Sequence, residues 1–166
     1  MSATHDFVTT AKRYRAFVEV TEGLDPDDIV LQLQEHLLAL YGGAVSLSVG
    51  DPSDSDLPAA RHEEWAALHQ RLGSKLGDFD YYSLVFDPYD LEAKPVVGSL
   101  ADDIASIYQD LGDGLVMIEG GESLEAAVWQ WRWSFDNHWG RHAAHALYAV
   151  FSLTHPGSLR SIRTFL

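Results

Sequence analysis

The chain has 166 residues, of which 46% are hydrophobic, and it carries a formal net charge of −14 with no cysteine. The length predicts a single domain with its own hydrophobic core. The charge argues against nucleic-acid binding and against docking on an anionic membrane, because such a surface repels phosphate groups. The lack of cysteine excludes disulfides, zinc–thiolate sites and cysteine nucleophiles.

Nothing in the amino-acid pattern indicates secretion or membrane insertion. Residues 1–10 are polar and lack the apolar segment of a signal peptide, and no apolar run approaches the length of a membrane span. We therefore expect a cytoplasmic protein without a membrane partner. Residues 1–166 are predicted to form one helical domain that ends in a short tail, residues 156–166.

The first half of the chain predicts three helices. Residues 4–20 place hydrophobic side chains at spacings of three and four, and Gly23 ends this helix. The second helix begins at Asp25 and Pro26, a typical N-cap followed by proline at the first helical position, and we expect Gly42-Gly43 to end or loosen it. Residues 50–58 form a loop, and a third helix covers residues 60–77.

Residues 78–98 show no sustained period and contain two prolines. They are predicted to form a long aromatic loop, with a short helical turn inside, that packs over the bundle because its aromatic rings are not expected to remain in water. Packing is favoured over a functional role for this loop.

Two further helices complete the expected fold. Ser99 followed by Asp102 forms a capping-box pattern at the start of one helix, which Gly120-Gly121 ends. The last helix begins near Glu122 or Ser123 and ends at the sequence HPGS, residues 155–158. With short connections, four or five long helices predict an all-α, antiparallel up-and-down bundle.

The last helix has hydrophobic residues on two faces when it is drawn at about 100° per residue. Trp129, Trp133, Leu147 and Phe151 lie on one face and form a candidate partner surface, which we expect to be covered by residues 79–89 or by a second chain. The other face, directed at the core, carries the following residues: Leu124, Val128, Trp131, Phe135, His138, Trp139, His142, His145, Ala146 and Ala149.

Three segments of the chain resemble a known family. FDPY at residues 86–89, GSLADDIASIYQDLGDGL at residues 98–115 and WQWRWSFDNHWGRHAAHAL at residues 129–147 are similar to the diagnostic segments of a bacterial family named domain of unknown function 5063. The resemblance implies an all-α, up-and-down bundle. It implies no reaction, cofactor or catalytic residue.

The histidines of the last helix form the strongest chemical pattern. His138, His142 and His145 follow an i, i+4, i+7 spacing, and two imidazoles at i and i+4 can share a metal ion. Carboxylates for such a site would come from Asp103 and Asp110. The alternative is a buried polar network without metal, in which each histidine bonds to a partner such as Asp103 or Asp110. Acid–base catalysis is a third reading, but no nucleophile accompanies these residues.

Asp102 is assigned a capping or helix-dipole role, because adjacent helical residues point about 100° apart and two neighbouring carboxylates would not share one substrate atom.

Two functions follow from these patterns. The first is a non-enzymatic protein-interaction domain that binds a protein partner or a second copy and needs no cofactor. The second is a metal-binding enzyme or sensor that uses the candidate polar cluster, namely Asp103, Asp110, His138, His142 and His145.

Overall fold

The computed structural model describes residues 3–48 and 62–155 and shows a mostly all-α protein, as the sequence predicts. Three short helical turns, η1 (Thr21–Gly23), η2 (Gly77–Phe79) and η3 (Phe135–Trp139), link longer elements. A small antiparallel hairpin consists of β1 (Tyr81–Leu84) and β2 (Val96–Ser99). The helices are α1 (Ala3–Val20), α2 (Pro26–Val45), α3 (His62–Leu76), α4 (Leu100–Glu119), α5 (Leu124–Ser134) and α6 (Gly140–Thr154).

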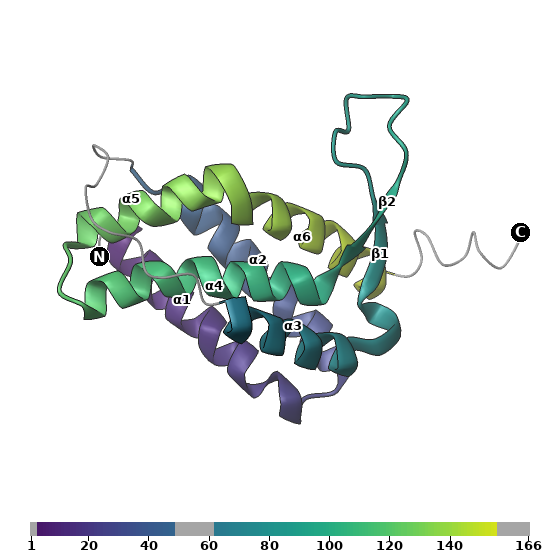
Figure 1. Ribbon diagram of the computed structural model, residues 1–166, viewed down its shortest axis with the longest axis horizontal. Coiled ribbons are helices and arrows are strands. Elements are labelled where there is room, and N and C mark those ends of the chain that lie inside the picture. The colour runs from purple at the N-terminus through teal and green to yellow at the C-terminus, as the bar shows by residue number, and fades with distance from the viewer. Residues whose placement is uncertain (1–2, 49–61, 156–166) are drawn as a thin grey trace, which may run out of the picture.

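Helix α4 is the central element of the bundle. It packs against α1, α3, α5 and α6, while α2 packs against α1 and α6 (Figure 1). The hairpin rises from one end of the bundle, between α3 and α4. The loop predicted over residues 50–58 and the tail from residue 156 lie outside the described residues. In the described part of the chain, no helix combines the length and the hydrophobicity needed to cross a bilayer.

Aromatic rings join the two ends of the chain in the core. Phe7 of α1 lies edge-on to Trp131, with ring centroids 5.2 Å apart, and stacks 6.4 Å from Trp139. Both tryptophans are fully buried, and both indole N–H groups are satisfied by backbone carbonyls. Trp131 donates to Leu111 at 3.0 Å and Trp139 donates to Trp131 at 3.2 Å.

Glycines allow these rings to lie directly on neighbouring helices. A Cβ at Gly114 of α4 would be 2.3 Å from the indole of Trp131, and a Cβ at Gly43 of α2 would be 2.9 Å from the ring of Phe7. Helix α2 continues through Gly42 and Gly43 and ends two residues later at Val45, so the glycine pair does not itself end the helix. Packing against Phe7 offsets the low helix propensity of the two glycines.

Residues 78–98 form a hairpin rather than a loop packed over the bundle. Tyr82 pairs with Gly98 and Leu84 pairs with Val96, so backbone hydrogen bonds between two short strands organise the segment. Its tip extends away from the helices, where Tyr89 is 92% and Leu91 is 95% exposed. The predicted packing holds at the base, where Phe79 and Tyr82 lie against the core, and is wrong for the exposed tip. The hairpin itself was not predicted, because strands of four residues are too short to show a period in the sequence.

The predicted last helix is divided by a π turn. In η3 the N–H of Gly140 reaches the carbonyl of Phe135, five residues earlier, which inserts one extra residue between α5 and α6. A Cβ at Gly140 would meet that carbonyl oxygen at 2.4 Å, so only glycine fits there without a shift. The extra residue rotates α6 relative to a straight helix, and Gly140 is buried.

The contact between Gly114 and Trp131 generates the first prediction. Gly114→Ala places a methyl group inside the volume of the indole, and we expect it to lower the free energy of unfolding by about 1–3 kcal/mol. Gly42→Ala is the matched control, since Gly42 is exposed in α2 with no atom within 4 Å of an added Cβ. That control is expected to stabilise the helix slightly. Urea denaturation of both variants tests the prediction, and equal stability of the two would contradict it.

Candidate functional site

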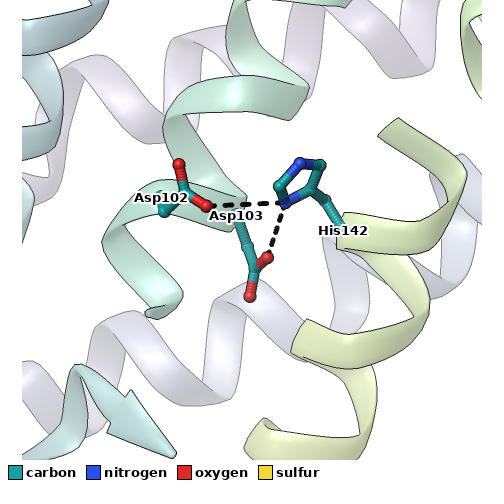
Figure 2. A group of neighbouring side chains, drawn as sticks. All are labelled: Asp102, Asp103 and His142. Carbon is teal, nitrogen blue, oxygen red and sulfur yellow. Dashed lines mark hydrogen bonds and ion pairs between the residues drawn. The ribbon is translucent and has the colours of Figure 1, made fainter. Parts of the chain in front are cut away.

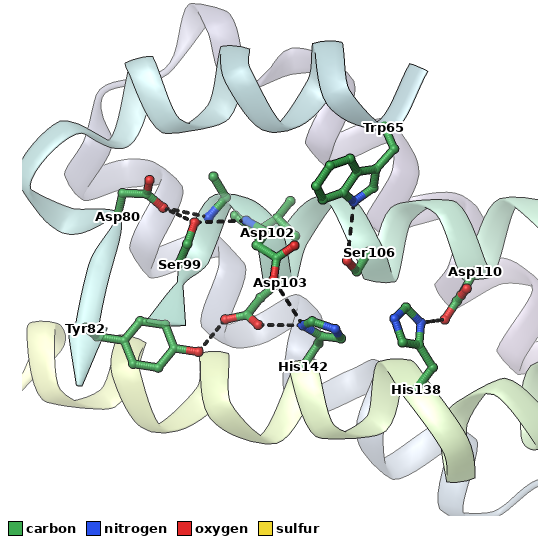
Figure 3. A network of polar contacts seen from close by, with 12 residues as sticks. Trp65, Asp80, Tyr82, Ser99, Asp102, Asp103, Ser106, Asp110, His138 and His142 are labelled. Atoms are coloured by element: carbon green, nitrogen blue, oxygen red, sulfur yellow. Dashed lines mark hydrogen bonds and ion pairs between the residues drawn. The ribbon is translucent and has the colours of Figure 1, made fainter. Parts of the chain in front are cut away.

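The base of the hairpin is fixed to the first turn of α4. The buried carboxylate of Asp80 accepts hydrogen bonds from the Ser99 hydroxyl and from the Ala101 N–H, both at 2.8 Å (Figure 3). The Ser99 hydroxyl in turn accepts from the backbone N–H of Asp102 at 3.1 Å, as an N-cap. The capping side chain is therefore that of Ser99, and Asp102 lies in the first turn of α4, where its charge complements the helix dipole as predicted.

Asp103 connects three elements through its buried side chain. Its Oδ2 accepts a hydrogen bond from the Tyr82 hydroxyl of β1 at 2.6 Å, and its Oδ1 lies 2.8 Å from Nδ1 of His142 on α6. Burial raises the pKa of Asp103, whereas these two hydrogen bonds act in the opposite direction. Burial also raises the pKa of Tyr82, so the phenol remains protonated and donates to the carboxylate.

Asp102 also faces His142, contrary to the expectation from the sequence. One carboxylate oxygen of Asp102 lies 3.9 Å from Nδ1 of His142 (Figure 2). Potential ligand atoms of Asp102, Asp103 and His142 all lie within 4.8 Å of one another. Adjacent residues of one helix do diverge, but His142 comes from a second helix and lies between them. We call these three residues the Asp–Asp–His cluster.

A second carboxylate–histidine pair lies farther along the same two helices. Nδ1 of His138 is 2.7 Å from Asp110, and this hydrogen bond raises the pKa of His138. The rings of His138 and His142 are neighbours, with centroids 4.9 Å apart. The side chain of His138 is 53% exposed, so its predicted inward orientation is wrong. The extra residue of η3 explains the difference.

His145 does not join either pair. Among the described residues it has no hydrogen-bond partner, and its ring contacts the edge of Phe86 at a centroid distance of 6.3 Å. Partial burial lowers the pKa of His145. The structure thus distributes the five predicted polar residues over two pairs, Asp103–His142 and Asp110–His138, and leaves His145 apart from both.

Asp102 of α4 and His138 and His142 of the last helical segment form a polar row that lies between two cavities. The hairpin cavity, about 430 Å³, lies between the hairpin and α6 and has an apolar wall of Tyr82, Leu84, Phe86 and Val97. Its opposite wall is polar and consists of Asp102, Asp103, His138, Arg141, His142 and His145. A second cavity of about 380 Å³ lies beside α3 and includes Trp65, whose indole donates to Ser106. Asp102, His138 and His142 line both cavities, so ligands can reach the cluster from two sides.

The candidate partner surface is only partly exposed. Trp129 and Trp133 stack on each other with centroids 6.2 Å apart, and Trp133 is 48% exposed. Leu147 is half-buried, while Phe151 is 47% exposed and stacks on His155. The expected cover by residues 79–89 is not seen, because the base of that segment lies beside His145 and its tip faces solvent.

Reasoning from the sequence missed three residues of this site: Tyr82, Asp80 and Arg141. Tyr82 becomes visible only when YYSL, residues 81–84, is treated as a strand with alternating inward side chains. Asp80 shows no local pattern, since its partners lie about twenty residues later in the chain. Arg141 follows Gly140 directly, and its orientation depends on the π turn.

The hydrogen bond between Tyr82 and Asp103 generates the second prediction. Tyr82→Phe leaves one oxygen of a buried carboxylate without its donor, and we expect a loss of about 1–3 kcal/mol in the free energy of unfolding. Tyr81→Phe is the matched control, because that neighbouring side chain is 70% exposed. Denaturant unfolding of both variants is the measurement. A Tyr82→Phe protein as stable as the Tyr81→Phe protein would show that the bond does not stabilise the fold.

Comparisons with known proteins agree with this fold. A crystal structure of protein BF1032 from Bacteroides fragilis, a structural genomics target, superimposes with a TM-score of 0.77 over 92% of each chain at 24% sequence identity. No curated protein matches the sequence. The family model described as "Domain of unknown function (DUF5063)" matches residues 1–155. The chain therefore belongs to the DUF5063 family.

Proposed function

We propose that this protein binds a divalent first-row transition metal ion at the Asp–Asp–His cluster. One observation carries the proposal: ligand atoms of Asp102, Asp103 and His142, contributed by two helices, lie within 4.8 Å of one another in a wall shared by two cavities. Two carboxylates and one imidazole form an oxygen and nitrogen donor set that suits zinc, manganese or ferrous iron.

The cluster can exchange a proton for a metal ion. Without metal, His142 Nδ1 and Asp103 Oδ1 lie 2.8 Å apart and share one hydrogen-bonding proton. An ion would take the place of this proton, because a histidine ligand binds through a deprotonated nitrogen. Positions left open on the ion would face the cavities and admit a ligand. This arrangement suits an enzyme or a sensor.

A structural network without metal explains part of the same geometry. It accounts for Asp103, whose two oxygens are satisfied by Tyr82 and His142. It does not use Asp102, which sits in the first turn of α4 as a helix-dipole residue; its half-buried carboxylate lies 3.9 Å from His142 and forms no hydrogen bond with the described residues. Asp102 is therefore the residue whose substitution separates the two explanations.

The third prediction is a zinc-binding measurement on protein that has been treated with EDTA and dialysed. We expect one zinc ion to bind per chain, as measured by titration calorimetry. We also expect zinc to raise the melting temperature of the protein. An ion at a hundred times its Kd stabilises a protein by about 2.7 kcal/mol. We expect Asp102→Asn and His142→Ala to lower zinc affinity at least about tenfold, equivalent to about 1.4 kcal/mol.

Matched controls are available on other helices. Asp28→Asn removes an exposed carboxylate at the start of α2, and His69→Ala removes an imidazole of α3 that stacks on Trp65. Both are expected to bind zinc as the wild type does. If zinc leaves the melting temperature of wild type unchanged, or raises that of Asp102→Asn equally, the cluster is a structural network only.

A protein-interaction role is the second candidate, and the exposed tip of the hairpin favours it. Phe86, Tyr89 and Leu91 present apolar side chains to solvent at 62%, 92% and 95% exposure. Exposed apolar groups that project from a fold are typical of docking sites. In this reading, the tip binds a second copy of the chain and Trp133 adds to the contact.

The fourth prediction tests that role by sedimentation velocity. Wild type is expected to dimerise, and the double variant Tyr89→Ser/Leu91→Ser is expected to sediment as a monomer, because it removes the two most exposed apolar side chains of the tip. Val20→Ser is the control for an exposed apolar residue, 59% exposed, at another place. A wild-type protein that stays monomeric at every concentration measured would contradict self-association through the hairpin.

A further inference from the structure

The hairpin cavity has two unlike walls, and this contrast defines the chemistry of its ligand. Leu84, Phe86 and Val97 present hydrocarbon surface on the hairpin side. The Asp–Asp–His cluster and Arg141 present charge and hydrogen-bonding groups on the helical side. A volume of about 430 Å³ is within the range of small-molecule sites. The cavity therefore suits a small molecule with an apolar body and one polar end.

Arg141 determines the charge of that polar end. It is exposed at the cavity, next to His142 in α6, and it forms no hydrogen bond or ion pair with the residues that the structure describes. An arginine without a partner in a protein of net charge −14 can still offer its full set of donors to a ligand. Guanidinium groups bind carboxylates and phosphates through two parallel hydrogen bonds.

The two aspartates would repel an anion, but a bound ion changes this balance. A divalent cation offsets the charges of Asp102 and Asp103, after which Arg141 leaves the polar wall with a net positive charge. An oxyanion would then meet both the ion and the guanidinium. This step depends on the metal site proposed above.

The hairpin side of the cavity is held in a defined position. The ring of Tyr82 lies over Gly98, where a Cβ would be only 2.7 Å from the ring, and its hydroxyl is bonded to Asp103. The rings of Phe86 and of His145, on the opposite wall, form a T-shaped contact with centroids 6.3 Å apart. A ligand body placed between the walls would lie against aromatic and branched aliphatic groups, which favour a hydrocarbon ring or a branched chain.

We propose that the hairpin cavity binds a small organic oxyanion, a carboxylate or a phosphate monoester. Its charged group bridges the metal ion and Arg141, and its hydrocarbon part lies against Leu84, Phe86 and Val97. The inference rests on the proposed metal site and adds the class of ligand that this site accepts.

Ligand-observed NMR titration of zinc-loaded protein tests this inference with three probes of similar shape. 3-Phenylpropionate and phenyl phosphate represent the two oxyanions, and 3-phenylpropanol is the neutral probe. We expect one or both oxyanions to bind at least about tenfold more tightly than the alcohol, and the tighter of the two identifies the head group. Without zinc, oxyanion binding is expected to weaken by a similar factor.

Two variants locate the binding site, and each has a control. Arg141→Gln is expected to lower oxyanion affinity about tenfold, whereas Arg13→Gln removes an exposed arginine of α1 and is expected to have no effect. Phe86→Ala is expected to weaken binding of the oxyanion, and Leu91→Ala, at the exposed tip, is not. Zinc affinity is measured on every variant, so that a lost ion is not mistaken for a lost oxyanion site.

The outcomes separate this inference from the metal proposal. If wild type does not bind zinc, the proposed function fails and the bridged oxyanion fails with it. If zinc binds but neither oxyanion does, only the ligand class is overturned. Equal affinity for the alcohol, oxyanion binding that does not depend on zinc, or unchanged affinity in Arg141→Gln would each overturn it as well.

Discussion

The arrangement of the site depends on the hydrogen bonds of one buried carboxylate, that of Asp103. It is buried, and a carboxylate taken out of water is costly unless hydrogen bonds replace its hydration. Its two oxygens find donors on different elements, the Tyr82 hydroxyl of the hairpin and the His142 imidazole of α6. If either partner moved away, the buried carboxylate would lose a hydrogen bond that replaces its hydration. This requirement holds α4, α6 and the base of the hairpin together. The walls of the hairpin cavity follow from this restraint.

The π turn is the second constraint, and it acts through backbone geometry. The core needs Trp131 and Trp139 on the side that faces Phe7, while the polar row needs His138 and His142 on the side that faces α4. One inserted residue, allowed by Gly140, changes the direction of α6 relative to α5 and meets both needs. π turns cost helix stability and are often found at functional sites. This turn contains His138 and ends three residues before His142.

Stability and chemistry share the same residues here. The contacts that satisfy Asp103 as a buried group also bring an imidazole and a second carboxylate within reach of one point. In such a network, a substitution can change folding and ligand binding together. Asp102 is the exception, since its half-buried side chain contributes no hydrogen bond to the described structure.

The helices could be predicted from local information. Periodic hydrophobic residues, proline after Asp25, the Ser99 cap and the glycine pair at 120–121 act within a few residues, so they identify α1 to α4 and the start of α5. The same spacing identified His138 and His142 as neighbours on one helix face, with Asp103 and Asp110 as their expected carboxylate partners. The family assignment likewise followed from segments of the last half of the chain.

The remaining features required the tertiary structure, since each depends on partners distant in the chain. The hairpin is stabilised by pairing between strands more than ten residues apart. Each strand is too short to give a recognisable pattern in the sequence. The π turn depends on packing of Phe135 and Trp139 in the core, which no helical wheel includes. Tyr82, Asp80 and Asp102 acquire their roles only where β1, α4 and α6 meet. The sequence by itself determined which segments are helical and identified Asp103, Asp110, His138 and His142 as candidate residues, because these signals are local. The tertiary structure alone decided which side chains share a cavity, because that depends on long-range packing.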